Sequence, residues 1–586
     1  MDPSGAGEIA AAAKRAKPPW DTATSIAVDR LSALPDEILA EILLSVTSPD
    51  AVQTCVLSKR WCSLWKLLPD LHFPFFPKPA GSFRDALDDQ QQDLQVRPLH
   101  LRDLKVEGHD HGQGDGDLPS SIATWLPAAA RRVHGRFTLL VHGDPTRIAP
   151  DEDEAADAAV IVELPCFEQA TSISIGLSFR GRLAFLPPDV AGVFSRLTDL
   201  WLERVQFQDP SALGDAISSA RCPCLQTFHV CRGLGLEKLA VSSTSLLKLD
   251  LQKLHGLLEL TVETPGLKEL QVVDCFCTPA GETDQLPAPV ISITAPELVA
   301  LDWRDSITQD AIGFAHGLQH LRSLGTFLFF VYGDEDADSY NRDCVRILQG
   351  FRSIVTLTLI LAVLDIDDDD EYLMEAITVL PDLTTLHLVI MSSGHCFGNS
   401  SLHVLRICTG IRKLVLELSS ISESKEPCPF GCICRQQSNW QNKELALVCL
   451  QEIEIQGFGP SEHDSGFVEH LFDRATSLSK ATIFFDESVT EGMAKELCWM
   501  FQLSSKVHID LRYHNNKKYQ QSTCAPLLDN FYPDPTSMAE PDGSWASHVA
   551  PLVPTSTYAL MDLQPINGTR PLKYLRKLTR GPNEAH

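Results

Sequence analysis

Three closely spaced cysteines are the residues of this sequence best suited to metal chemistry. Cys428, Cys432 and Cys434 lie in the segment EPCPFGCICRQQSNW with the spacing C-x3-C-x-C. A structural zinc site needs four ligands, usually in two well-spaced pairs, so a fourth ligand would have to come from elsewhere. The candidates for it are Cys408, Cys449 and His463. We expect reduced thiols in a long loop rather than a metal site.

Three other polar segments could offer ligands to a cation. The segment GHDHGQGDGD, residues 108–117, has two histidines and three aspartates, but glycine and aspartate at this density are typical of a flexible loop. The acidic runs GDEDADS, from Gly333, and DIDDDDE, from Asp365, lack the ligand spacing and the turn glycine of an EF-hand loop. We therefore predict solvated loops at all three places.

The other reactive side chains form no catalytic pattern in the sequence. There is no nucleophile elbow, glycine-rich phosphate-binding loop or paired catalytic motif, and the histidines and serines are scattered. The sequence therefore predicts a protein that is not an enzyme by itself and has no catalytic residues, no cofactor and no bound metal.

Composition and charge narrow the classes of partner. The chain has 586 residues, 44% of them hydrophobic, and a formal net charge of −28 with a pI near 5.0. Because a nucleic-acid backbone is bound by a basic face, we expect no nucleic-acid partner. No apolar run approaches the roughly 20 residues that cross a bilayer, so we expect no membrane association. The longest run, VTLTLILAVL, is better interpreted as a buried strand.

The cysteines and the N-terminal segment indicate a compartment. There are 17 cysteines, an odd number, and EIAAAAKRAKPPW lacks the apolar stretch of a secretory signal. These features predict reduced thiols and a location in the nucleus, the cytoplasm or both.

The stretch 29–73 carries the most specific pattern of the chain, and it predicts three short helices. Pro35 suits the first turn of the first helix because it has no N–H to leave unpaired. The residues SPD at 48–50 predict a second helix with a side-chain cap, and Ser58 can cap a third. The third helix has an apolar stripe of Trp61, Leu64, Trp65 and Leu68. A core of about 45 residues is small, so several apolar groups should finish their burial against something else.

The segments LPDEIL, CVLSKRW, LW and LP of this stretch resemble an F-box of the kind found in plant F-box proteins with leucine-rich repeats. The resemblance implies binding to a Skp-type adaptor, which links the F-box to a cullin scaffold and a ubiquitin-conjugating enzyme. By match to the motif, eleven residues are predicted to face the adaptor or to support that face. They are Leu34, Pro35, Ile38, Leu39, Val52, Cys55, Val56, Leu57, Ser58, Trp61 and Trp65. Cys62 stands where many relatives carry a basic residue, so one peripheral contact can differ.

A short pattern, apolar-x-x-apolar-x-apolar, recurs twelve times after the F-box-like stretch. Its copies begin at Leu101, Ala170, Leu197, Leu225, Leu246, Leu267, Leu298, Ile354, Leu383, Ile411, Leu450 and Leu478. Several successive copies are 21 or 28 residues apart, which is within the period of leucine-rich repeats. Each copy predicts a short strand with alternate side chains turned inward, and stacked copies bury a continuous core under a parallel sheet.

Two features predict what lies opposite that sheet. Extra copies of the pattern begin at Leu236 and Leu257, about halfway along the shorter repeats, and they predict outer strands there. The longer repeats leave room for helices in RDCVRILQGFRSI, residues 342–354, and DSGFVEHLFDRAT, residues 464–476.

The segment from Leu445 to Arg512 looks like the FBD-type region that follows the repeats in these plant F-box proteins. Its pattern predicts strand, loop, helix, strand and helix, which would close the open end of the repeat array.

Together, these features predict an α/β protein: a small three-helix F-box, then a curved leucine-rich-repeat solenoid with a parallel β-sheet face and an α+β C-terminal cap. The predicted boundaries are a disordered leader at 1–27, the F-box at 28–73, a linker at 74–96, the solenoid at 97–444, the FBD-like cap at 445–514 and a mostly disordered tail at 515–586.

The resemblance implies a function by proximity. The F-box would bind the Skp-type adaptor of a cullin-based (SCF-type) E3 ubiquitin ligase, and the repeats would hold a substrate protein that the sequence does not identify. Two alternatives stay open. One is a small-molecule (hormone) receptor of the same architecture, to which Trp201, Arg204, Arg232 and Trp303 near strand ends could contribute. The other is a non-degradative interaction scaffold.

Overall fold

The computed structural model describes most of the chain between residues 34 and 513. The described residues are 34–88, 101–109, 118–143, 160–178, 181–186, 192–254, 256–276, 289–304, 312–314, 320–349, 351, 354–363, 366, 369–392, 394–420, 432–436, 445–459, 462–486, 489–490, 492–493 and 508–513. The predicted leader and tail, and the residues 110–117 of the histidine- and aspartate-rich segment, lie outside them. The chain divides into two compact units, Met1–Leu68 and Pro69–His586, which are described separately.

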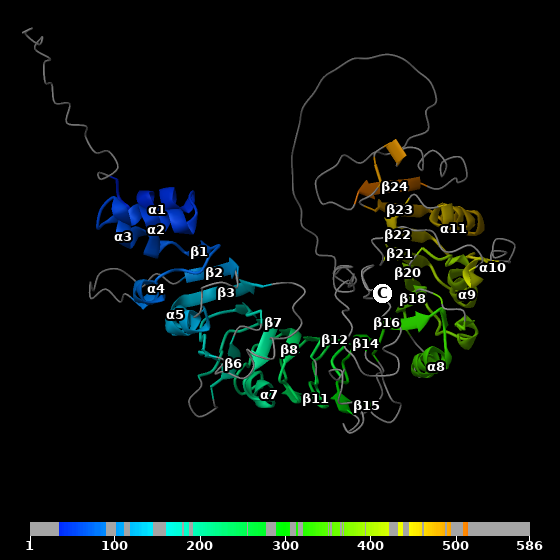
Figure 1. The fold of residues 1–586 in the computed structure, drawn as a ribbon, viewed down its shortest axis with the longest axis horizontal. Helices are drawn as coiled ribbons and strands as arrows, with labels where there is room; N and C mark the ends of the chain where they lie inside the picture. Colours follow the sequence, from blue (N-terminus) through cyan, green and yellow to red (C-terminus); the bar gives the residue numbers. More distant parts are fainter. Residues whose placement is uncertain are drawn as a thin grey trace, which may run out of the picture. The chain divides into compact units, whose positions relative to one another are not determined.

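The first unit is helical, as predicted (Figure 1). It contains α1 (Asp36–Leu44), α2 (Ser48–Gln53), the 3-10 helix η1 (Thr54–Val56), α3 (Trp61–Leu64) and the 3-10 helix η2 (Trp65–Leu67). The stripe on the third helix is confirmed, because Trp61, Leu64, Trp65 and Leu68 are all buried. The predicted cap of the second helix is corrected by one residue. The Thr47 hydroxyl, not that of Ser48, accepts the Asp50 N–H at 3.3 Å, because Thr47 has the extended backbone of a cap.

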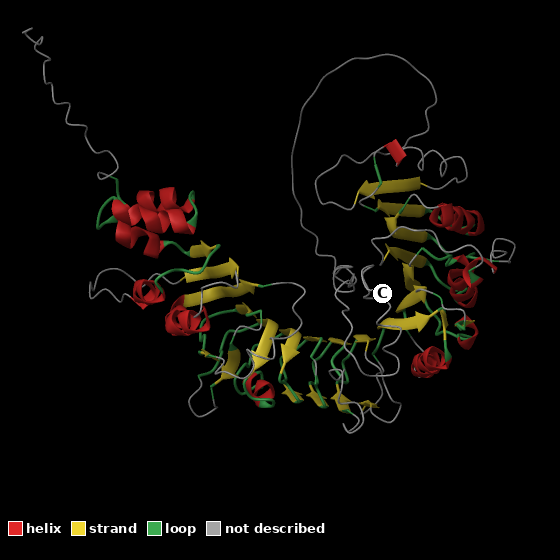
Figure 2. Cartoon of the chain, viewed as in Figure 1, coloured by secondary structure: helices red, strands yellow, loops and turns green. Residues whose placement is uncertain are grey.

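The second unit is built on one 18-stranded sheet, seen as a succession of strands in Figure 2. Sixteen strands pair in parallel, in chain order. They are β1 (Asp70–Phe73), β2 (Leu101–His109), β3 (Val133–His142), β5 (Ser172–Gly176), β7 (Asp199–Phe207), β8 (Thr227–Leu234), β10 (Lys248–Gln252), β12 (Glu269–Val273), β14 (Ala300–Arg304), β16 (Ser323–Phe330), β18 (Thr356–Val363), β20 (Thr385–Ser392), β21 (Lys413–Ser420), β22 (Glu452–Phe458), β23 (Lys480–Phe485) and β24 (His508–Tyr513). Two more strands join the sheet: β6 (Arg182–Phe185) pairs with β7, and β4 (Ile161–Leu164) pairs with β6.

The repeat pattern explains this sheet. Each of the twelve predicted copies forms a strand, and all three apolar residues of every copy are buried. The middle residues stay in register from coil to coil, as in the run Leu200, Phe228, Leu249, Leu270 and Leu301. The predicted architecture, an F-box followed by a leucine-rich-repeat solenoid with a parallel sheet, is therefore confirmed.

The outer side of the coils changes along the chain. Strands β9 (Lys238–Ser242), β11 (Glu259–Glu263), β13 (Val290–Thr294) and β15 (Ile312–Phe314) form a second parallel sheet, so the predicted outer strands are confirmed. Elsewhere the coils carry helices (Figure 2): α4 (Ala80–Asp88), α5 (Leu118–Arg132), α7 (Ala212–Ala216), α8 (Glu335–Gln349), α9 (Gly398–Ile407), α10 (Ile433–Gln436) and α11 (Glu462–Arg474). The short elements β17 (Tyr332–Gly333), β19 (Glu371–Tyr372) and η3 (Met374–Ala376) complete the set.

Three expectations about connecting segments were wrong. The predicted linker contains α4, whose Phe83 ring lies 5.2 Å from Phe73 and 5.5 Å from Trp125, so this segment is part of the core. The strand β1 pairs with β2, which moves the start of the repeat unit back to residue 69. The acidic run that follows Gly333 begins α8 rather than forming a loop, because the Asp334 carboxylate accepts the Ala337 N–H at 3.2 Å.

The described part of the FBD-like segment continues the repeat. Strands β22, β23 and β24 extend the main sheet in parallel register, and α11 lies between the first two in sequence. The second helix predicted for this segment falls largely outside the described residues. Among the described helices, none combines the length and apolar character that a membrane span requires.

Candidate functional site

The first unit carries a clamp that fixes the start of its first helix. The Arg60 guanidinium, in the turn before α3, lies 2.6 Å from the Asp36 carboxylate and donates to the Leu34 carbonyl at 2.6 Å. These contacts join residues that are 24 and 26 positions apart in sequence. They hold Leu34 and Pro35, the residues that lead into α1, against the turn that precedes α3.

The first unit also exposes a set of large aliphatic side chains. The exposed fraction is 88% for Val56, 62% for Leu57 and 41% for Ile38. Ile42, Leu44 and Val46 are also exposed. Ile38 and Ile42 are one helical turn apart and therefore share a face of α1. A soluble protein rarely leaves several such groups together in water unless the surface binds another molecule.

The eleven residues predicted from the motif fall into three groups. Pro35, Ile38, Val56, Leu57 and Ser58 are exposed, and Leu34, Val52 and Cys55 are partly buried. Leu39, Trp61 and Trp65 are buried, with exposed fractions of 0%, 8% and 4%.

The buried group can support a binding face but offers a partner little surface of its own. The exposed Ile42, Leu44 and Val46 were not among the residues predicted to face the adaptor. The helical spacing of Ile42 from Ile38 was the available signal.

The two cysteines of this unit are structural. The Cys62 thiol donates to the Cys55 carbonyl at 3.2 Å, which links η1 to α3. Burial, reinforced by Cys62, raises the pKa of the Cys55 thiol, so Cys55 stays protonated near neutral pH. At the position where the F-box resemblance predicts a basic residue, this chain therefore has a thiol with an internal partner.

The residues considered for a small-molecule site separate in the fold. Trp201 is 44% exposed, and its ring stacks on that of His229 with the centroids 3.6 Å apart. The His229 Nδ1 lies 2.7 Å from the Asp250 carboxylate. Trp303 is instead buried in the core of the array, with 3% exposed, so its ring has almost no surface to offer a ligand.

Three basic residues occupy matching positions on adjacent coils: Arg204, Arg232 and Lys253. Each directly follows a strand residue, and those three strand residues are paired with one another across β7, β8 and β10. All three have left-handed backbones, with φ of 49°, 55° and 53°. Such a conformation is costly for residues with a Cβ and is found more often at functional sites.

Of the candidate metal ligands predicted from sequence, Cys408, Cys432, Cys434 and Cys449 have described side chains. Cys428 lies outside the described residues, as does the side chain of His463. Cys449 is exposed, and burial raises the pKa of Cys408 to about 12. Cys432 and Cys434 do come together, but with His395, which sequence reasoning missed. No local signal pointed to this histidine, which is 37 residues away from Cys432.

Comparison with known proteins agrees with these observations. Residues 31–73 match the family described as F-box domain. An F-box/FBD/LRR-repeat protein of Arabidopsis thaliana is 28% identical over 262 residues, which cover 42% of this chain and 53% of the relative. An F-box/LRR-repeat protein of the same plant is 26% identical over 77% of this chain and 92% of its own length. Another is 21% identical over 80% of this chain and 90% of its own length. The predicted similarity to plant F-box/leucine-rich-repeat proteins with an FBD-type region is confirmed.

Proposed function

We propose that this chain is the substrate-recognition subunit of a cullin-based E3 ubiquitin ligase of the SCF type. Its F-box binds a Skp-type adaptor, the adaptor connects it to a cullin scaffold, and the repeat array holds a substrate protein. The chain itself contributes binding and no chemistry. Its effect is to raise the local concentration of the substrate beside the activated ubiquitin. We place this activity in the nucleus, the cytoplasm or both.

The observation that carries the proposal is the exposure of Val56 and Leu57 inside the matched F-box domain. Transfer of one such side chain from water into an interface contributes about 1.5–3 kcal/mol. The surrounding helices are held by buried Leu39, Trp61 and Trp65, so the exposed groups are presented on a packed support. A few apolar anchors on a rigid support are typical of a specific protein interface.

The test is co-purification of the full chain with the adaptor, using the double substitution Val56→Asp and Leu57→Asp. Two charges placed in an apolar interface should abolish capture, because they would be buried without partners. The matched control is Val379→Asp in the repeat unit, at a residue that is 60% exposed. The control should retain capture. Full adaptor binding by the folded double variant would contradict the proposal.

The double variant also tests the ligase role. A chain that holds its substrate but has lost the adaptor should accumulate that substrate in cells. Quantitative mass spectrometry of proteins captured by the wild-type and double-variant chains would identify a protein that is enriched only with the variant. Captured partners of equal abundance in both cases would instead support the non-degradative scaffold.

A second candidate function, a small-molecule receptor, is favoured by the exposed Trp201 ring and by Arg204 and Arg232, whose left-handed backbones lie at matching positions on adjacent coils. An aromatic face and guanidinium groups together suit a planar ligand that bears a carboxylate or phosphate group. A thermal-shift screen of the full chain against such compounds tests this. A shift that Trp201→Ala removes, and that Val379→Ala retains, would support the receptor.

A further inference from the structure

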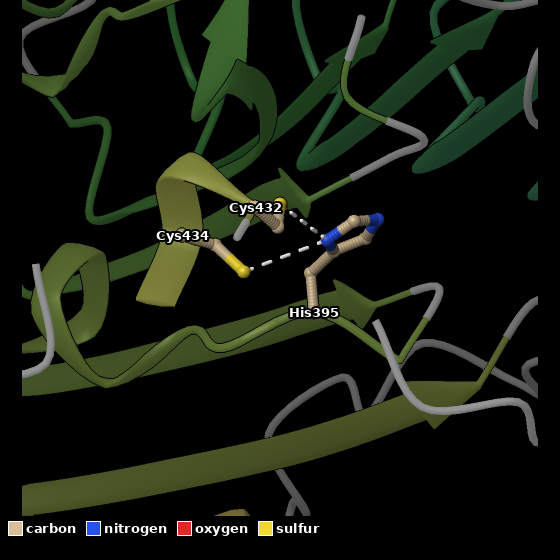
Figure 3. Close-up of side chains that lie close together, drawn as sticks. All are labelled: His395, Cys432 and Cys434. Carbon is tan, nitrogen blue, oxygen red and sulfur yellow. Dashed lines mark hydrogen bonds between the residues drawn. The ribbon is translucent and has the colours of Figure 1, made fainter. Parts of the chain in front are cut away.

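Three side chains of the repeat unit converge on one point (Figure 3). His395 lies between β20 and α9, Cys432 immediately precedes α10, and Cys434 is in α10. The His395 Nδ1 is 3.4 Å from the Cys432 sulfur and 3.6 Å from the Cys434 sulfur. All three atoms lie within 4.8 Å of one another.

These separations match the geometry of a zinc site. Zinc binds cysteine sulfur at about 2.3 Å and histidine nitrogen at about 2.0–2.1 Å, with tetrahedral angles. Those values place a sulfur and a nitrogen ligand about 3.6 Å apart. The two observed sulfur–nitrogen distances, 3.4 and 3.6 Å, differ from this value by no more than about 0.2 Å.

Hydrogen bonding alone accounts for the cluster less well. The Nδ1 of a neutral imidazole has one lone pair and accepts one hydrogen bond along it. Two thiols are nevertheless directed at this single nitrogen, as Figure 3 shows. A cation between the three atoms would be coordinated by both sulfurs and the nitrogen at once.

The surroundings suit a permanently bound ion. His395 and Cys434 are buried, with 6% and 3% exposed. The histidine loop is fixed because the Ser392 hydroxyl donates to the His395 carbonyl at 2.9 Å. By contrast, α10 is a single turn of four residues, and a helix this short is not stable from its own hydrogen bonds.

We propose that His395, Cys432 and Cys434 bind a structural zinc ion that fastens α10 to the segment between β20 and α9. Binding removes one proton from each thiol, and both protons go to solvent. Two thiolates, a neutral imidazole and Zn²⁺ have no net charge, which suits a buried place. These residues supply three of the four tetrahedral ligands, and a neutral group such as water takes the fourth position, which leaves this charge balance unchanged.

Metal analysis of the purified full chain, prepared under reducing conditions, tests the proposal. The wild type should hold one zinc per chain, and Cys432→Ser with Cys434→Ser should lower zinc affinity by more than about tenfold. Cobalt in place of zinc should give a thiolate charge-transfer band, which each single serine variant should reduce by half. Cys449→Ser, at an exposed thiol, and His403→Gln, in α9, are the matched controls and should leave zinc content unchanged.

A second measurement uses only the wild-type chain, so it tests the proposal even if the double variant does not fold. Removing the metal from the wild type with a chelator should lower its melting temperature, and added zinc should restore it, because a ligand bound only by the folded state stabilises that state. Wild-type chain that holds no zinc and gives no cobalt–thiolate band would overturn the proposal. Equal zinc content in the wild type and the folded double variant would also overturn it.

Discussion

The two units of the chain use the same aliphatic residues in opposite ways. In the repeat unit, Leu249 and Leu251 of β10 have no exposed surface. In the F-box unit, Val56 and Leu57 are among the most exposed large hydrophobic residues of the described chain. The coil that contains Leu249 is covered by the coil on either side, because β10 pairs with both β8 and β12.

This difference in exposure shows how far each unit buries its aliphatic residues by itself. A stacked coil buries the three apolar residues of its repeat pattern against its own neighbours, so those positions need no other molecule for their burial. In the F-box unit, α1 buries Leu39 and Leu43 but exposes Ile38 and Ile42, and Val56 and Leu57 are exposed between α2 and α3. We interpret those groups as half of an interface whose other half is on a different protein.

The largest expected effect comes from the buried side of this comparison. Leu249→Ala should lower the free energy of unfolding by about 2–5 kcal/mol, because it leaves a cavity in a packed core. Leu247→Ala, two positions earlier at a residue that is 41% exposed, should change it by less than about 0.5 kcal/mol. Urea unfolding followed by circular dichroism measures both. Equal losses would break the comparison, since they would mean that burial does not distinguish the two leucines.

The second effect concerns binding rather than stability. Leu57→Ala should weaken adaptor binding by about 1–3 kcal/mol, because an apolar anchor is lost from the interface. It should change the unfolding free energy by less than about 0.5 kcal/mol, because Leu57 is exposed in the chain alone. Calorimetric titration with the adaptor and a thermal melt would separate the two quantities. A loss of stability without a loss of affinity would place Leu57 in a core instead.

A smaller effect is expected at the clamp that holds the F-box entry. Arg60→Met should cost about 0.5–1 kcal/mol of stability, because the partly exposed pair with Asp36 is screened by solvent. A double-mutant cycle with Asp36→Asn isolates the pair. If the clamp also presents the exposed aliphatic residues, adaptor affinity should fall with it. Unchanged affinity would show that those residues keep their positions without the clamp.

The smallest effect is a pH dependence in the repeat unit. A hydrogen bond from Lys480 holds the pKa of Glu452 below its usual value of 4.5. The folded state therefore releases this proton more readily than the unfolded state does. The resulting stabilisation is present above pH 4.5 and is lost as the pH falls through the lower, folded-state value.

Glu452→Gln removes that dependence. The variant should be less stable than the wild type at neutral pH by under about 1 kcal/mol, since both partners are partly exposed. The difference should shrink on acidification. If the stability difference between the two proteins grew as the pH fell, the pKa of Glu452 would be raised in the folded state rather than lowered. The effect is small beside that of Leu249→Ala because surface charge adds little to a core that stacking already completes.

The strands of the repeat array were predictable from sequence wherever all three apolar residues of the pattern are present. All twelve copies form strands, because alternate apolar residues of a strand turn inward and stacked coils bury them together. Strand β16 was missed because Thr326 stands where the third apolar residue is expected after Leu321 and Leu324. The structure has a register shift between Leu324 and Phe327 at that place, which the spacing rule does not allow for.

The candidate sites were predictable to different degrees. The F-box residues lie within one short stretch, so the motif located them, but it did not distinguish buried Leu39 from exposed Ile38. Burial there depends on how the helices pack, which neighbouring residue types do not determine. His395 is beyond the reach of local patterns, because its approach to Cys432 depends on how one coil of the solenoid stacks on the next.

The shared register of the coils has an evolutionary consequence. Leu249 is paired with Phe228 on one side and with Leu270 on the other, and these three residues are 21 positions apart. Deleting one such coil would bring Phe228 opposite Leu270. The two strands would then pair in the same register as before. The gene of such an array can therefore lengthen or shorten in whole units by unequal recombination, changing the span of the binding surface while the rules of pairing stay the same.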